Sequence, residues 1–262
     1  MRLATASLSD RGGRQRNEDA IGDWSSERLY YCVLADGAGG HGGGDTASAI
    51  VVNSVLADLR YLTVAELPPT GQRLVRAIEN ANANILEEQA HGDVALKDMR
   101  STVVLLAIDC ELRTAAWAHC GDSRLYCFRG GQVSVQTRDH SLVQEMIDAR
   151  LITPGQARRH PRRNVLLAAL GTAGKLEIDG FEGTYGLLDR DAFLLCSDGL
   201  WEYVDETYMI EALGDAATPD AWLSALAARV HALAPASHDN FSALAVWIVD
   251  PEDMASTILK PG

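Results

Sequence analysis

Short apolar segments, separated by only a few polar or glycine residues, follow one another along much of this 262-residue chain. Such close spacing favours antiparallel neighbours, because parallel strands need a crossover of about a dozen residues or more. The segment 109–113 and the pair Gly130-Gly131 are typical of tight turns between two strands. Strands are expected at 3–8, 29–35, 102–108, 114–119, 125–128 continuing into 133–136, 193–196 and 243–249. The spacing therefore predicts largely antiparallel sheets.

Helices are expected in three other places. Apolar residues recur at helical spacing on one face of the segment 72–89. A second helix is predicted to begin at Thr218-Pro219, because threonine caps a helix and proline fits its first turn. A third helix follows a glycine-rich loop, over about residues 45–59. Sheets with amphipathic helices grouped apart from them predict an α+β layered sandwich.

The chain is predicted to form one domain over residues 1–249, since its length suits a single domain and it shows no internal repeat. A charged stretch at about 138–165, which contains two prolines, is expected to form two short helices in an insertion. Residues 250–262 show no packing pattern and are expected to be a tail.

Charge and hydropathy restrict where this chain can act. The formal net charge is −13, which disfavours nucleic acid and anionic membranes because both require basic patches. No apolar run has the length of a signal peptide or a membrane span, so a cytoplasmic protein is expected. The five cysteines lack paired spacing, which indicates neither a disulfide framework nor a zinc knuckle. No coiled-coil pattern indicates an oligomer, and a monomer is expected.

Carboxylates recur beside the expected strand ends in five short motifs. These motifs are Asn17-Glu18-Asp19, Asp36-Gly37, Gly121-Asp122-Ser123-Arg124, Ser197-Asp198-Gly199 and Asp239-Asn240. Each alone is typical of an aspartate that caps a turn, but five together can point into one cleft at the sheet edge. Two divalent ions about 3.5–4 Å apart require such clustered carboxylates. The scattered histidines form no zinc-protease motif, so the carboxylates predict a two-metal site.

The glycine-rich loop at 37–45 lacks the lysine and hydroxyl of a P-loop. Its glycines are instead expected to let the backbone pass close to the metals. The carbonyl near Gly37 would then reach a metal-bound water, and Asp45 would open the following helix.

The motifs, in this order, resemble those of the bacterial metal-dependent type 2C (PPM) protein phosphatases. The resemblance covers about residues 5–249. It rests on the segments 14–19 and 35–41, Ser101-Thr102-Val103, Gly121-Asp122-Ser123-Arg124, Asp139-His140-Ser141, His160-Pro161, Arg163-Asn164, Ser197-Asp198-Gly199 and Asp239-Asn240.

The resemblance implies a four-layer α-β-β-α sandwich, in which helices flank two mostly antiparallel sheets and the insertion forms a flap. It also implies two Mn²⁺ or Mg²⁺ ions at one end of the sheets, and a third ion seen in bacterial relatives. By this resemblance, Asp36 bridges the two ions and Gly37 supplies its carbonyl, while Asp198 and Asp239 hold one ion. Glu18 and Asp19 form an acidic pair that reaches the ions partly through water. Asp122, together with Asp198, holds the third ion.

The implied reaction is hydrolysis of phosphoserine and phosphothreonine by an activated water, without a phosphoenzyme. Arg14 stands at the position of the phosphate-binding arginine, where it can hold two phosphate oxygens. The general acid stays open, because relatives carry histidine or methionine where this chain has Ala38. His41 is a candidate acid, and the alternative is that His41 structures its loop while a metal-bound water donates the proton.

Other phosphatase classes lack their motifs here. His119-Cys120 opens like an HC(x)5R loop, but position 126 is tyrosine rather than arginine. The segment 189–193 lacks the last residue of DxDx(T/V), and no GNH(D/E) segment is present. The alternative from another class is a catalytically silent phosphatase fold that binds a phosphoprotein or another partner. For an active enzyme, the resemblance implies substrates phosphorylated by a eukaryotic-like serine/threonine kinase.

Overall fold

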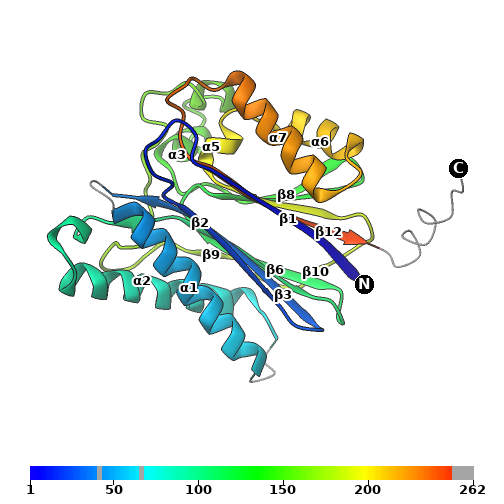
Figure 1. Cartoon of the computed structure of the whole chain (residues 1–262), viewed down its shortest axis with the longest axis horizontal. Coiled ribbons are helices and arrows are strands. Elements are labelled where there is room, and N and C mark those ends of the chain that lie inside the picture. Colours follow the sequence, from blue (N-terminus) through cyan, green and yellow to red (C-terminus); the bar gives the residue numbers. More distant parts are fainter. Residues whose placement is uncertain (40–42, 65–67, 250–262) are drawn as a thin grey trace, which may run out of the picture.

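Two antiparallel sheets lie face to face in the computed structural model, which describes residues 1–39, 43–64 and 68–249 (Figure 1). The first sheet has the order β1 (Arg2–Asp10), β12 (Phe241–Val249), β11 (Ala192–Cys196), β7 (Arg124–Arg129) and β8 (Gln132–Gln136). The second sheet has the order β10 (Tyr185–Gly186), β6 (Thr114–Cys120), β5 (Val103–Asp109), β3 (Leu29–Ala38) and β2 (Asp19–Ser25). Two short strands extend it, because β4 (Arg100–Ser101) pairs with β3 and β9 (Asp179–Gly180) pairs with β6.

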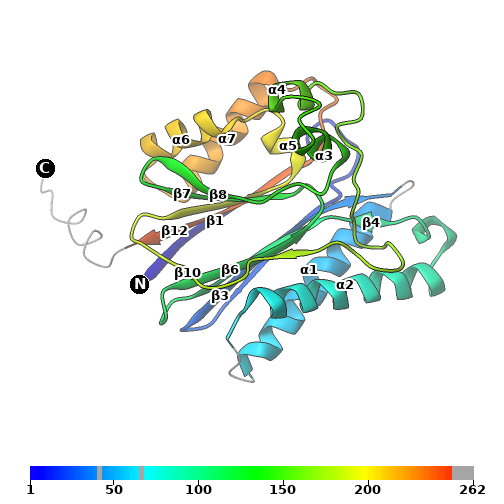
Figure 2. The same cartoon turned by 180° about the vertical axis from the view of Figure 1, so that it is seen from behind.

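Helices cover the outer face of each sheet (Figure 2). The second sheet is covered by α1 (Gly43–Val64) and α2 (Gly71–His91), with the short 3-10 helix η1 (Val94–Leu96) after them. The first sheet is covered by α5 (Asp198–Trp201), α6 (Glu206–Asp215) and α7 (Pro219–Leu233). The arrangement confirms the expected four-layer α-β-β-α sandwich.

The apolar core is divided into three layers by the two sheets. One cluster joins α1 and α2 to the second sheet and includes the fully buried Leu59 and Ile78. Another joins the helices α5, α6 and α7 to the first sheet around Trp222. The third lies between the sheets and includes the fully buried Leu34 and Phe193. Burial on both faces explains why β3 and β5 are continuous apolar runs rather than alternating ones.

The expected hairpin turn at Gly130-Gly131 is confirmed. Both glycines have positive φ, +60° and +75°, and they connect β7 to β8. A two-residue turn with two positive φ angles matches the twist of the flanking strands, and only glycine adopts it at little cost.

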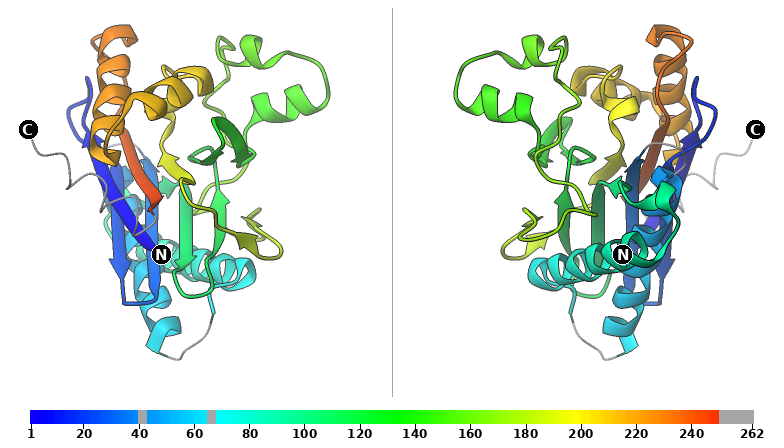
Figure 3. Two further views of the ribbon diagram at one scale, coloured as in Figure 1. Left: turned by 90° about the vertical axis from the view of Figure 1, so that its right-hand side faces the viewer. Right: turned by 90° about the vertical axis from the view of Figure 1, so that its left-hand side faces the viewer.

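The charged stretch expected to contain two short helices does so. It carries α3 (Leu142–Asp148) and α4 (Pro154–Ala157), and Figure 3 shows this segment projecting from the side of the sandwich. Ser141 caps α3, and Thr153 caps α4 through a capping box that includes Gln156. The predicted tail, residues 250–262, lies outside the described part of the chain.

Several elements were not expected from the sequence, among them β2, α5, α6 and the short elements η1, β4, β9 and β10. Strand β2 is an edge strand whose residues are at most partly buried, and its sequence, DAIGDWS, shows no regular alternation of apolar and polar residues. Helix α5 is a single short turn directly after β11, and α6 is a short helix that follows α5 and has Asp205 as an ordinary N-cap. Across the described residues, no helix has the length and apolar character needed to cross a membrane.

Candidate active site

A cavity of about 240 Å³ opens where the ends of the two sheets meet, and five of its lining residues carry carboxylates. The lining includes the carboxylates Glu18, Asp36, Asp122, Asp198 and Asp239, together with Arg14 and Arg100. The structure therefore brings the five sequence motifs together in one place.

Each carboxylate lies at or next to the end of a strand. Asp36 lies near the end of β3, and Glu18 directly precedes β2. Asp122 lies in the turn between β6 and β7. Asp198 begins α5 just after β11, and Asp239 lies just before β12. Two sheets packed face to face thus deliver side chains to a shared edge, although the residues are far apart in the sequence.

Hydrogen bonds fix the backbone of Asp36 on both sides. Its N–H donates to Thr102 Oγ1 at 3.0 Å, and its carbonyl accepts from the Thr102 N–H at 2.8 Å. The Ser101 hydroxyl donates to the same carbonyl at 3.2 Å. A hydrogen bond of 2.7 Å joins the Thr102 and Ser123 hydroxyls, so Asp36 is tied to the residue after Asp122.

Two glycines of the motifs are required by close backbone packing. A Cβ on Gly37 would lie 2.0 Å from the carbonyl oxygen of Gly44. A Cβ on Gly199 would lie 2.0 Å from the carbonyl oxygen of Asn240. Any side chain at either position would therefore push apart the segments that carry the carboxylates.

Mutual repulsion and burial make ionisation of these carboxylates costly. Burial raises the pKa of Asp36 well above its ordinary value, and the carboxylates of Asp19 and Asp198 raise it further. The pKa of Asp198 is also raised well above its ordinary value, first by burial and then by the carboxylates of Asp122 and Glu202. Burial raises the pKa of Asp122 to about 7, with Asp139 adding to the effect. A divalent cation would relieve all of these costs at once.

Asp19 does not line the cavity, but it lies beside it as the cross-strand partner of Asp36. The Ser197 hydroxyl donates to its Oδ2 at 2.8 Å, while its Oδ1 is buried with no hydrogen-bond partner among the described residues. An orphaned buried carboxylate oxygen next to Asp36 fits a cation ligand, either directly or through water.

Arg14 lies at the exposed rim, where its Nη2 donates to Asp239 Oδ2 at 2.7 Å. The loop that carries it is anchored by the Gly13 N–H, which donates to the His238 carbonyl at 3.0 Å. Ala38 also lines the cavity, and His41, the candidate acid, lies outside the described residues.

The position of Arg100 in the cavity and the hydrogen bond from Ser197 to Asp19 were not predicted from the sequence. Arg100 lines the cavity as the cross-strand partner of Ala38. In the sequence, the only indication of these roles is adjacency to a motif. Arg100 directly precedes Ser101-Thr102, and Ser197 directly precedes Asp198.

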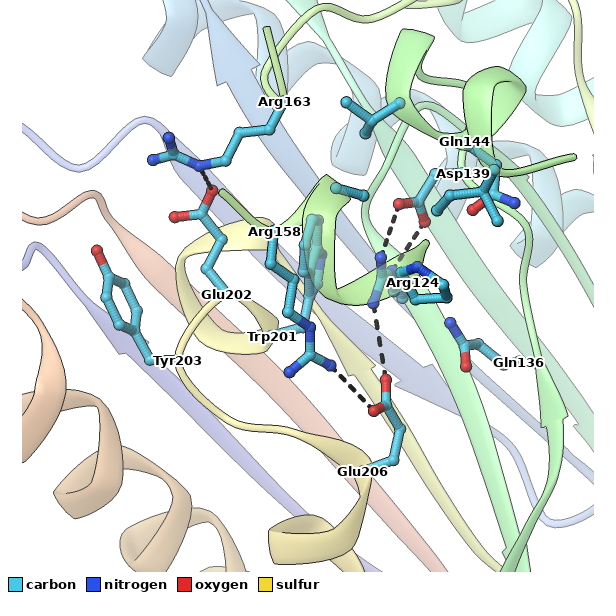
Figure 4. A pocket seen from close by; sticks show the side chains of 14 residues that line it. Arg124, Gln136, Asp139, Gln144, Arg158, Arg163, Trp201, Glu202, Tyr203 and Glu206 are labelled. Carbon is cyan, nitrogen blue, oxygen red and sulfur yellow. Dashed lines mark hydrogen bonds and ion pairs between the residues drawn. The ribbon is translucent and has the colours of Figure 1, made fainter. Parts of the chain in front are cut away.

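A second cavity, of about 460 Å³, lies between the flap helices and α5 (Figure 4). Arg163 and Glu202 form an ion pair of 2.7 Å at its edge, and Arg158 pairs with Glu206 at 3.1 Å. Arg124 binds Asp139 through two hydrogen bonds of 2.8 Å. The flap arginines Arg158 and Arg163 are therefore held by carboxylates of the domain, and Arg124 of β7 holds Asp139 at the start of the flap.

A different group has donor atoms close enough to share one metal ion. Among the described residues, His119, His140 and Asp179 each offer one donor atom, and these atoms lie within 4.8 Å of one another. None of the three lines the carboxylate cavity.

Comparisons with known proteins agree with the geometry. The family described as Protein phosphatase 2C matches residues 9–247. The serine/threonine phosphatase stp of Listeria monocytogenes is 37% identical over 209 residues, which cover 78% of this chain and 81% of the relative. The crystal structure of PstP/Ppp from Mycobacterium tuberculosis is 30% identical, with a TM-score of 0.78 over 95% of this chain and 99% of that one. A structure of the PstP catalytic domain with two manganese ions is 28% identical, with a TM-score of 0.75 and the same coverage. This chain therefore belongs to the protein phosphatase 2C family and is a metal-dependent serine/threonine protein phosphatase of the PPM type.

Proposed function

We propose that this protein hydrolyses phosphoserine and phosphothreonine in proteins at the carboxylate cavity, with two Mn²⁺ or Mg²⁺ ions as cofactors. The observation that carries the proposal is the convergence of five carboxylates from both sheets on one cavity, where burial and repulsion raise the pKa values of Asp36 and Asp198. A relative with two manganese ions supports the number of ions.

The carboxylates and one carbonyl of the cavity would hold the ions. Asp36 would bind both ions, and Gly37 would supply its carbonyl. Asp198 and Asp239 would bind one ion, while Glu18 and Asp19 would act partly through water. Asp122, together with Asp198, would hold a third ion. When bound, two such ions supply a water of lowered pKa that attacks phosphorus. The chain's own task is to fix the carboxylates, and the hydrogen bonds from Thr102 and Ser197 do this for Asp36 and Asp19.

Arg14 would bind the phosphate. Its guanidinium already lies at the rim of the cavity, bound to Asp239. If a cation held Asp239, Arg14 would be able to hold two phosphate oxygens with its planar fork. This places positive charge where negative charge accumulates during the reaction.

The proton for the leaving alkoxide has two proposed sources. Ala38, at the position where relatives carry histidine or methionine, cannot donate one. His41 is one source and a metal-bound water is the other. The two are separated by the alkaline side of the pH–rate profile, which His41→Ala alters only if His41 is the acid.

The proposed substrates are phosphoproteins made by a eukaryotic-like serine/threonine kinase in the cytoplasm, and the proposed state is a monomer. The relatives from Listeria and Mycobacterium are both named as serine/threonine phosphatases, which supports this substrate class. The net charge of −13 makes nucleic acid an unsuitable partner.

Phosphate release from a phosphothreonine peptide tests the proposal. Wild-type protein with Mn²⁺ is compared with wild-type protein in chelator and with the Asp36→Asn variant. Activity that requires both the metal and Asp36 supports the dimetal reaction. No activity with any divalent metal would instead support a catalytically silent fold that binds a partner.

A further inference from the structure

The group His119, His140 and Asp179 lies between the second sheet and the start of the flap. His119 and Asp179 are cross-strand partners on β6 and β9, so their side chains share one face of the sheet. The imidazole of His140 stacks on that of His119, with ring centroids 4.7 Å apart. Both histidines are almost fully buried, at 3% and 2% exposed, whereas the Asp179 side chain is 56% exposed. Solvent therefore reaches the group only from the side of Asp179.

One imidazole nitrogen in this group has no hydrogen-bond partner. His140 Nε2 is buried without one among the described residues, although Asp179 Oδ2 lies 3.3 Å away. With Zn–N and Zn–O bonds of about 2.0–2.2 Å, two ligands of a tetrahedral zinc ion lie about 3.3–3.5 Å apart. His140 and Asp179 already have the separation that two ligands of one zinc ion need.

His119 is oriented in the manner of a metal-binding histidine. Its Nε2–H donates to the Arg138 carbonyl at 2.7 Å, which leaves Nδ1 with its lone pair available. Histidine ligands of metals commonly donate their other ring N–H to a backbone carbonyl. Burial and the neighbouring His140 also lower the pKa of His119, which keeps the ring neutral.

His140 must change its hydrogen bonding to bind a metal. The Gly121 N–H donates to Nδ1 at 3.2 Å, so a neutral ring carries its proton on Nε2. Binding a metal at Nε2 displaces this proton. The ring then takes up a proton at Nδ1, and the hydrogen bond from the Gly121 N–H is lost. The ring stays neutral, and occupancy of the site by a metal is thereby linked to the Gly121 peptide, which precedes Asp122.

We propose that His119, His140 and Asp179 form a second metal site, which takes a borderline-soft divalent ion such as Zn²⁺ with solvent in the remaining position. Two imidazoles and one carboxylate suit zinc, whereas the all-oxygen cavity suits Mn²⁺ or Mg²⁺. The site does not depend on the proposed phosphatase reaction, because none of its residues lines the carboxylate cavity.

Titration of the full-length protein with Zn²⁺, followed by calorimetry, tests the site. The measurement is made in excess Mg²⁺ on the Asp36→Asn background, so that the oxygen cavity contributes little. We expect Asp179→Ala to weaken Zn²⁺ binding by about 100-fold, because loss of a ligand costs at least as much as loss of an outer-shell partner. Glu177→Ala is the control, since it removes the same charge from an exposed position two residues earlier.

Cobalt provides an independent readout. Co²⁺ bound to two imidazoles and a carboxylate in a four-coordinate site gives intense visible absorption, while octahedral oxygen sites absorb weakly. We expect the intense bands in the Asp36→Asn protein, their loss in Asp179→Ala, and their loss in His119→Gln. Equal Zn²⁺ affinity in the Asp179→Ala and Glu177→Ala proteins, or a purely octahedral Co²⁺ spectrum, would overturn the proposal.

Discussion

Thr102 and Ser123 share a hydrogen bond of 2.7 Å between two hydroxyls that are buried in the domain. Thr102 Oγ1 also accepts the Asp36 N–H at 3.0 Å, and Ser123 directly follows Asp122. One pair of hydroxyls thus ties the backbone of Asp36, near the end of β3, to the turn that carries Asp122. The spacing of the proposed metal ligands depends on groups that would not bind metal themselves.

Replacing Thr102 with valine should weaken both the fold and metal binding. The valine keeps the shape but leaves the Asp36 N–H without its partner, at a cost of about 1–3 kcal/mol for a buried group. We expect lower stability in urea unfolding and weaker Mn²⁺ binding by calorimetry. Thr102→Ser, which keeps the hydroxyl, is the matched control and should resemble the wild type. An unchanged Mn²⁺ affinity in the valine variant would show that the hydroxyl pair does not position Asp36.

Replacing Arg14 should affect the reaction more than the fold. Its side chain is 55% exposed and its pair with Asp239 lies at the surface, so little stability depends on it. We expect Arg14→Ala to lower kcat/KM by about 100-fold or more, as loss of a group that stabilises developing charge does. Arg14→Lys should recover only part of this, because an ammonium lacks the bidentate fork.

Arg16→Ala is the control for Arg14, since Arg16 is also exposed and contacts Asp45 at 3.5 Å. Steady-state kinetics with a phosphopeptide should show little change in this variant. If both alanine variants lose activity equally, a general loss of positive charge explains the effect, and a specific phosphate contact does not.

Without metal, stability should fall as the pH rises. Burial raises the pKa of Asp122 to about 7 and that of Asp19 to about 6, both from 3.8. The folded state therefore holds protons that the unfolded state has released, and the free energy of unfolding decreases from about pH 4 to about pH 7. Urea unfolding in chelator at several pH values measures this slope. Asp122→Asn should flatten it, and a slope of the opposite sign would contradict the assignment.

The sequence predicted the layers and the carboxylates but missed several contacts around them. Apolar strands and tight turns indicated the antiparallel sheets because these signals are local, as at Gly130-Gly131. Edge strand β2 (Asp19–Ser25) was missed because its sequence, DAIGDWS, shows no regular alternation of apolar and polar residues. The bond from Ser197 to Asp19 joins residues 178 positions apart, and nothing in either segment indicates the other. The metal-capable group of His119, His140 and Asp179 was missed for the same reason.

Breaking the ion pair between Arg163 and Glu202 should loosen the flap from α5. The pair is 2.7 Å long, and Glu202 is also the residue whose N–H donates to the Asp198 carbonyl at 2.9 Å. A partly exposed pair contributes about 0.2–1 kcal/mol, so we expect Arg163→Ala to raise KM for a phosphopeptide by about fivefold or less. Arg159→Ala, at an exposed flap position, should leave KM unchanged. Equal proteolysis of the flap in both variants would count against the idea.

Gly37 and Gly214 should respond oppositely to alanine. A Cβ at Gly37 would meet the Gly44 carbonyl oxygen at 2.0 Å, so the β3 end and the start of α1 must separate. We expect Gly37→Ala to lower the melting temperature and abolish activity, because Asp36 moves with its neighbour. At Gly214 in helix α6, a Cβ meets nothing within 4 Å, and alanine has the higher helix propensity. Gly214→Ala should therefore stabilise the protein by about 0.5–1 kcal/mol and leave activity intact, as thermal unfolding and phosphate release would measure. Loss of activity in both variants would mean that the effect at Gly37 reflects general sensitivity to glycine replacement rather than the close contact with Gly44.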